Sequence, residues 1–300
     1  PPKLGFFDLH RKVLRWMIRL AGHLDQLCKT EGHQSVWSPL YRDEVVWLYN
    51  EVGVFSYAEG ELYDAYALLG MAARLNKGIE KSHFGPRGAR VQLNLIACLI
   101  DMGKLDSAED RARSIESFGE PAPSKDFRLI KALAAAYLAN IVAVRGQSET
   151  GLKMMESALK ELGEIRTLDL SRSESLFRRI NAETLRLLGR HDDALVEFDA
   201  AIRLATVGGS MDLFHNACVS KARSLIELGR DNLAAINMLD RAGQYADIVQ
   251  SHRLKAETLA VRAEQLLAHG ETTIAGEFVL GALRIATLNG LVLKRCRDCE

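Results

Sequence analysis

A glycine that recurs every 40 to 43 residues restricts the fold of this sequence more than any other feature. Successive copies are 43, 43, 43, 40 and 41 residues apart, and a small residue follows five positions after each copy. A repeat of this length is typical of solenoids, in which each unit packs only on its neighbours. The glycines are Gly60, Gly103, Gly146, Gly189, Gly229 and Gly270, and the small residues are Ala65, Ala108, Gly151, Ala194, Ala234 and Ala275.

Each glycine separates two segments with helical periodicity, so the spacing predicts a helix pair around every copy. A residue that ends a helix often adopts positive φ, which costs glycine little. Carboxylates fall in the first turn of the expected second helices, where the helix dipole favours negative charge. These carboxylates are Asp64, Asp106, Glu149, Asp192 and Asp193. We therefore predict an all-α protein, a right-handed α-α superhelix of about six helical hairpins plus an N-terminal capping helix.

The chain divides into three predicted parts: an N-terminal helix and cap over 1–38, a repeat array over 39–286, and a C-terminal tail or incomplete cap over 287–300. A solenoid needs caps because its terminal units otherwise expose apolar surface. The apolar residues expected to form the N-terminal cap are Phe7, Trp16, Met17 and Leu20. The same helix carries a basic face, which leaves a partner-binding arm as the alternative.

Composition excludes some classes of partner. Lys plus Arg and Asp plus Glu both number 39, so the formal net charge is zero. Bulk nucleic-acid binding and polybasic membrane anchoring both require a basic surface. The five cysteines are an odd number, which favours free thiols in a reducing compartment. With no apolar run of membrane-spanning length and no signal-peptide pattern, we expect a cytoplasmic protein.

The helix pairs resemble the tetratricopeptide repeat (TPR). That family has a small residue in the first helix, glycine at the turn, and Ala, a large apolar residue and Ala in the second helix. Matching sets are Gly53, Gly60, Ala65, Leu69 and Ala72; Ala182, Gly189, Ala194, Phe198 and Ala201; and Ala263, Gly270, Ala275, Val279 and Ala282. The resemblance covers about residues 43–286. The standard period is about 34, so the longer period here indicates longer helices, as in kinesin-light-chain-like arrays.

No enzymatic signature is present: the sequence has no Walker-type phosphate loop, no dinucleotide-binding fingerprint and no His-Glu-x-x-His. We expect no catalytic residues and no cofactor. Cys296 and Cys299 have the spacing of two zinc ligands, but one pair supplies only half a structural site. A frayed tail or a truncation scar is the simpler interpretation.

The TPR resemblance implies that the first helix of each pair lines an inner groove in which peptides lie. Counting helical faces from the glycines places a ladder of polar side chains there. We predict the ligand-binding residues to be Asn94, Tyr137, Asn140, Arg179, Glu183, Arg186, Asn216 and Arg223, with Asn50, Arg90 and Glu227 on the same ladder. Asn can hydrogen-bond a peptide backbone as donor and acceptor, and Arg can hold a carboxylate through two bonds. The alternative is a solvated face of intrahelical ion pairs.

The arginines of this ladder fall on neighbouring units and predict a locally positive strip. Such a strip would prefer an acidic peptide segment or a free C-terminus. The predicted function is therefore non-catalytic protein or peptide recognition, with no nucleic acid and no membrane involved. The alternative is a sensor or regulatory segment of a larger signalling, transcription-regulatory or defence protein. An enzyme with an unrecognised site between helices is a third class, and the oligomeric state stays open.

Overall fold

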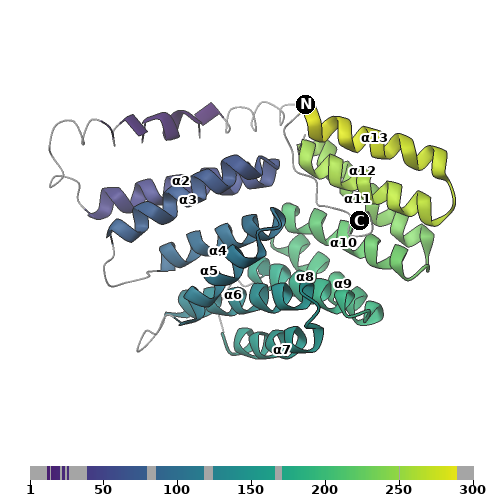
Figure 1. The fold of residues 1–300 in the computed structure, drawn as a ribbon, viewed down its shortest axis with the longest axis horizontal. Helices are drawn as coiled ribbons and strands as arrows, with labels where there is room; N and C mark the ends of the chain where they lie inside the picture. Colours follow the sequence, from purple (N-terminus) through teal and green to yellow (C-terminus); the bar gives the residue numbers. More distant parts are fainter. Residues whose placement is uncertain are drawn as a thin grey trace.

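The computed structural model describes residues 39–79, 86–117, 124–165, 171–249 and 251–288, together with parts of 12–26. Within the five long ranges every regular element is a helix, and twelve helices follow one another as six pairs (Figure 1). The pairs are α2 (Pro39–Glu59) with α3 (Leu62–Ile79), α4 (Pro86–Asp101) with α5 (Leu105–Ser117), α6 (Lys125–Val144) with α7 (Ser148–Glu164), α8 (Ser171–Leu187) with α9 (His191–Val207), α10 (Met211–Glu227) with α11 (Asn232–Val249), and α12 (His252–Ala268) with α13 (Thr272–Leu288).

The pairs stack in sequence order along a curved path (Figure 1). Each first helix contacts the first helix of the next pair, and each second helix from α3 to α11 also contacts the first helix that follows it. The all-α solenoid predicted from the glycine repeat is confirmed. The long period is explained by helix length, because first helices have 16 to 21 residues and second helices 13 to 18.

All six repeat glycines adopt positive φ, between 62° and 86°. In each turn, the N–H of the residue after the glycine donates to the carbonyl five residues earlier. At Gly60 this bond runs from Glu61 to Ser56 at 2.9 Å. This is the 6→1 bond of a Schellman motif, which satisfies a carbonyl at the end of the first helix. The turn also reverses the chain, so that the second helix packs back on the first.

Small residues allow the two helices of a pair to approach closely. Ala65, Ala108, Ala194 and Ala275 are completely buried. At the corresponding position of the third pair, a Cβ on Gly151 would lie 2.7 Å from the Ala139 carbonyl oxygen. Glycine therefore replaces alanine there because the α6 backbone is too close for any side chain.

The fifth pair departs from the predicted register by one residue. Ala235 is 1% exposed, whereas the predicted contact residue Ala234 is only partly buried. Asp231 is the cause: it adopts φ 44° and its Oδ1 accepts from the Ala234 N–H at 3.0 Å. This extra capping residue delays the start of α11 to Asn232.

The array curves until its last pair meets its first through a contact between α12 and α2. In Figure 1 the right-hand end of α2 lies beside the left-hand end of α12. Arg253 Nε lies 3.4 Å from the Ala58 carbonyl oxygen, 195 residues away in the chain. Its guanidinium lies 5.5 Å from the centroid of the Tyr57 ring. We call this contact between α2 and α12 the seam. A Cβ on Gly60 would lie 2.4 Å from Arg253 Cβ, so Gly60 allows the close approach at the seam as well as the turn between α2 and α3.

The two ends of the array differ from the interior. Ile18 packs against the large core cluster that includes residues of the first pair, and Arg15 lies 3.7 Å from Glu61, but Trp16 is 63% exposed and Leu20 42% exposed. Among the described residues of this segment, Ile18 makes the core contact, whereas Trp16, Met17 and Leu20 are exposed. Phe7 and residues 289–300 lie outside the described residues, so the predicted cap and tail remain predictions.

One described helix, α6, is long and apolar enough to pass a test for membrane spanning, and 72% of that window is buried inside the protein. Its buried side chains contact neighbouring helices on several sides. The apolar character of α6 is accounted for by its central place in the core.

We predict that Ala194→Arg destabilises the array strongly, because it forces a long charged side chain into the α8–α9 contact. The expected loss is roughly 3 kcal/mol or more, read as a lower urea midpoint and a lower melting temperature. Val196→Arg is the matched control, since Val196 lies on the same helix and is 66% exposed. Equal effects of the two substitutions would contradict the assigned packing face.

Candidate functional site

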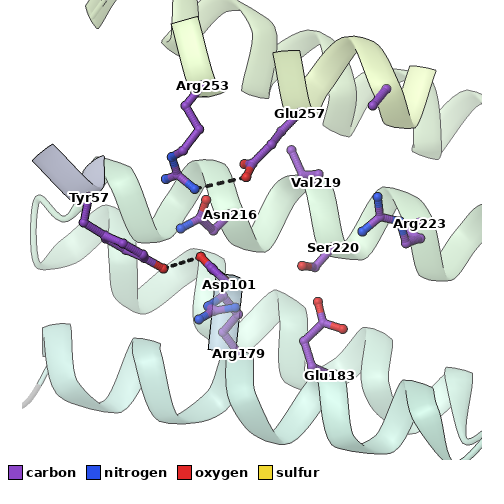
Figure 2. Close-up of a pocket in the computed structure, with 11 residues that line it drawn as sticks. Tyr57, Asp101, Arg179, Glu183, Asn216, Val219, Ser220, Arg223, Arg253 and Glu257 are labelled. Atoms are coloured by element: carbon purple, nitrogen blue, oxygen red, sulfur yellow. Dashed lines mark hydrogen bonds and ion pairs between the residues drawn. The ribbon is translucent and has the colours of Figure 1, made fainter. Parts of the chain in front are cut away.

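The inner side of the array holds a polar hollow lined by residues of five first helices. Figure 2 shows these lining side chains in close-up. We call this hollow the lumen. Residues from α2 and α4 face residues from α8, α10 and α12 across it. The residues that line the lumen are Tyr57, Asp101, Arg179, Glu183, Asn216, Val219, Ser220, Arg223, Arg253, Glu257 and Ala260.

Side-chain hydrogen bonds link equivalent positions of successive first helices along the inner face. The partners are 41 to 44 residues apart, which is one repeat to within a residue. Examples are Asn94 Nδ2 to Asn50 Oδ1 at 2.8 Å, Asn140 Nδ2 to Thr184 Oγ1 at 3.3 Å, and Arg223 Nε to Glu264 Oε2 at 2.9 Å. Part of the predicted polar ladder therefore holds neighbouring repeats together.

Two of the three predicted arginines are paired with carboxylates. Arg186 lies 3.0 Å from Glu183 and 2.5 Å from Glu227. Arg223 makes two bonds to Glu264, at 2.9 and 3.1 Å. The strip thus carries both signs of charge, and much of its positive potential is neutralised within the protein.

Arg179 is the exception. Its Nε is buried and has no hydrogen-bond partner among the described residues. An unpaired buried N–H costs roughly 1–3 kcal/mol, more when the group is charged. Tyr137 lies nearby: burial raises the pKa of its hydroxyl to about 12, although the charge of Arg179 acts in the opposite direction. Arg179 is therefore the lumen residue with unused capacity to bind an anion.

The seam supplies the other polar groups of the lumen. Tyr57 donates its hydroxyl to Asp101 at 2.5 Å, and Arg253 pairs with Glu257 at 3.0 Å (Figure 2). Burial and the adjacent Asp101 carboxylate hold the pKa of Tyr57 well above its ordinary value. The first two repeats and the last one therefore contribute jointly to one site.

Glu183 stays ionised at the centre of the lumen. Burial alone would raise the pKa of its carboxyl, but the charge of Arg186, a hydrogen bond with Ser220 and the charge of Arg179 lower it to about 2. The site therefore contains a fixed negative charge near Arg179, whose Nε has no hydrogen-bond partner among the described residues.

The structure brings half of the predicted site residues together. Arg179, Glu183, Asn216 and Arg223 line the lumen. The remaining four lie on the inner helices outside its lining: Asn94, Asn140 and Arg186 are bonded to neighbouring repeats, and Tyr137 is 7% exposed.

Sequence reasoning missed Tyr57, Asp101, Arg253 and Glu257. Glu257 could have been predicted from the sequence, because it precedes its repeat glycine by 13 residues, as the predicted site residue Asn216 does. Tyr57 and Asp101 are 44 residues apart on successive first helices, as are the other bonded pairs of the inner face. Arg253 reaches Tyr57 only because the array curves back on itself, which no local pattern encodes.

No group of three or more His, Cys, Asp or Glu side chains suited to a metal ion occurs in the described part of the chain. Cys296 and Cys299 lie outside it. The thiols of Cys98 and Cys218 are buried, which raises their pKa to about 12 and about 11.

No protein-family model matches the sequence, and a comparison with curated proteins finds no match. Solved structures do resemble the fold. PlcR of Bacillus thuringiensis, in complex with the peptide PapR7 and DNA, aligns with a TM-score of 0.57 and 16% identity over 75% of this chain and 76% of PlcR. A Rap protein complexed with Competence and Sporulation Factor aligns with a TM-score of 0.58 and 12% identity over 95% of this chain and 87% of the Rap protein.

The Rap conjugation gene regulator of plasmid pLS20, in complex with the Phr* peptide, aligns with a TM-score of 0.57 and 14% identity over 97% of this chain and 75% of the regulator. At such identities the likeness concerns the fold alone. Together with the repeat geometry, it identifies the chain as a TPR-like helical solenoid.

We predict that Glu183→Gln lowers stability at neutral pH and that the difference from wild type shrinks in acid. A carboxyl whose folded pKa of about 2 lies below its ordinary 4.5 stabilises the fold above 4.5, and this contribution is lost as pH falls toward 2. Urea unfolding between pH 7 and pH 3 measures the difference. Glu271→Gln, at an exposed position, is the control; a pH-independent loss in Glu183→Gln would contradict the assigned ion pairing.

Proposed function

We propose that this chain binds a short peptide segment in its lumen and that this recognition is non-catalytic. The observation that carries the proposal is Arg179, whose side chain lines a polar hollow and whose buried Nε has no hydrogen-bond partner among the described residues. A ligand carboxylate placed there would satisfy the guanidinium through a charge-assisted bond.

The other lumen groups suit a peptide better than a simple anion. Asn216 offers a donor and an acceptor, and Ser220 offers a hydroxyl, so both N–H and C=O groups of a peptide backbone can be matched. Glu183 and Glu257 would repel a strongly acidic ligand. The proposed ligand is therefore a segment with one carboxylate, from a side chain or a free C-terminus, directed at Arg179.

The similar structures supply a precedent for this use of the fold. PlcR and the pLS20 regulator were solved with peptides bound, PapR7 and Phr* respectively. Their low identity transfers no ligand to this chain, but the same architecture can evidently accommodate peptides. A regulatory role is the second candidate, because one relative was solved with DNA as well and another is described as a gene regulator. In that case peptide binding would control an effector carried on a larger protein.

We predict that Arg179→Ala weakens peptide binding at least ten-fold. A synthetic pool of ten-residue peptides with free ends would be selected on the wild-type protein and identified by mass spectrometry. Fluorescence anisotropy then measures each selected peptide, with affinities expected in the roughly micromolar range because a flexible ligand is ordered on binding. Binding should weaken with salt, since partly exposed charges are screened.

Removing the ligand carboxylate tests the contact directly. Amidating the C-terminus, or replacing the acidic side chain by its amide, should weaken binding to wild type but not to Arg179→Ala. Arg203→Ala, at an exposed position on α9, should behave as wild type. Undiminished affinity of an Arg179→Ala protein that melts normally would refute lumen binding through this residue.

A further inference from the structure

A second hollow lies on the other side of the helix pairs, between the second helices of the first two repeats. We call it the outer hollow. It is lined by Tyr66, Ala67, Gly70, Ala73 and Arg74 of α3 and by Arg111 of α5. None of these residues lines the lumen, so the two sites are separate.

Arg111 is held in the outer hollow without a counter-charge. Its Nη1 donates to Gln92 Oε1 at 2.6 Å, and Gln92 is itself 6% exposed. No ion pair joins Arg111 to a carboxylate within the described residues. Burial lowers the pKa of this guanidinium, although Tyr66 acts in the opposite direction. Among the described residues its hydrogen-bond partner is thus a neutral amide, which leaves a partly buried cation without charge compensation there.

Two further cations lie at the same place. Arg74 Nη1 lies 3.9 Å from where a Cβ on Gly70 would stand, so its guanidinium lies along the helix face that lines the hollow. Lys104 Nζ lies 4.6 Å from the centroid of the Tyr66 ring. The small residues Gly70 and Ala73 leave room between these groups for a ligand of several atoms.

The nearest acidic pairing on α5 is directed elsewhere. Glu109 pairs with Arg113 and Arg145, and Asp106 also pairs with Arg145. By contrast, Arg74 and Arg111 form no ion pair with a carboxylate of the described residues, whereas Arg186 and Arg223 of the inner face do. The outer hollow is thus a local concentration of positive charge on a protein whose formal net charge is zero.

We propose that the outer hollow binds a phosphoryl group as its dianion. Two guanidinium groups offer planar pairs of N–H donors that match phosphate oxygens, and the Tyr66 hydroxyl and Lys104 ammonium add further donors. A tetrahedral dianion carries more acceptor oxygens and more charge than a single carboxylate, so it suits a site with two guanidinium groups better. The phosphoryl group could belong to a free phosphate ester or to a phosphorylated side chain of a partner.

We predict that inorganic phosphate binds saturably at pH 7.5 and raises the melting temperature relative to sodium chloride of equal ionic strength. Isothermal titration calorimetry with inorganic phosphate gives the affinity. Arg111→Gln should weaken it at least ten-fold. Arg74→Gln should weaken it as well and changes an exposed side chain, so it tests the site even where Arg111→Gln perturbs packing against Gln92.

Arg203→Gln on α9 is the matched control and should bind phosphate as wild type does. A phosphoserine peptide that binds more tightly than inorganic phosphate would assign the site to a modified partner, and tighter binding of a small phosphate monoester would assign it to a metabolite. Absence of saturable binding of all three probes, or equal binding by wild type and both hollow variants, would overturn the proposal.

Discussion

The positive φ of six evenly spaced glycines is the constraint on which the rest of this structure depends. Each glycine ends one helix, satisfies its last carbonyls through the following residue, and returns the chain antiparallel. The small residue that follows allows the returning helix to pack closely. Where the backbones come closest, at Gly151, even a methyl group would overlap with the facing carbonyl. The pairs then stack because each leaves an apolar face for the next.

The regular spacing also determines the chemistry of the inner face. Because equivalent residues of successive first helices lie one repeat apart, polar side chains can bond to their own counterparts, as Asn94 does to Asn50 and Arg223 to Glu264. Most of the inner polar groups are used in this way. A ligand can bind most readily to polar groups that are not already bonded within the protein, and Arg179 is the clearest example.

The repeat made much of the fold predictable from sequence. The turns, the helix pairs, the contact residues and the use of first helices for the inner face all follow from local rules that recur six times. The register of α11 did not follow, because Asp231 takes a conformation that residues other than glycine seldom adopt. The site was only half predictable. Arg179 and Asn216 could be placed from their spacing to the glycines, but Tyr57 and Arg253 meet through the accumulated curvature of the whole array.

The seam also changes how the molecule should fold and unfold. In an open repeat array all contacts are between neighbours, so stability is close to a sum of local terms and terminal units can detach independently. Here Arg253 contacts Ala58 across 195 residues, which requires a long loop to be closed. Such a contact raises the contact order, slows folding and makes detachment of either end break the same interface. The contact between the two ends should therefore make this repeat array unfold cooperatively, as a closed domain does, instead of unfolding gradually from its ends.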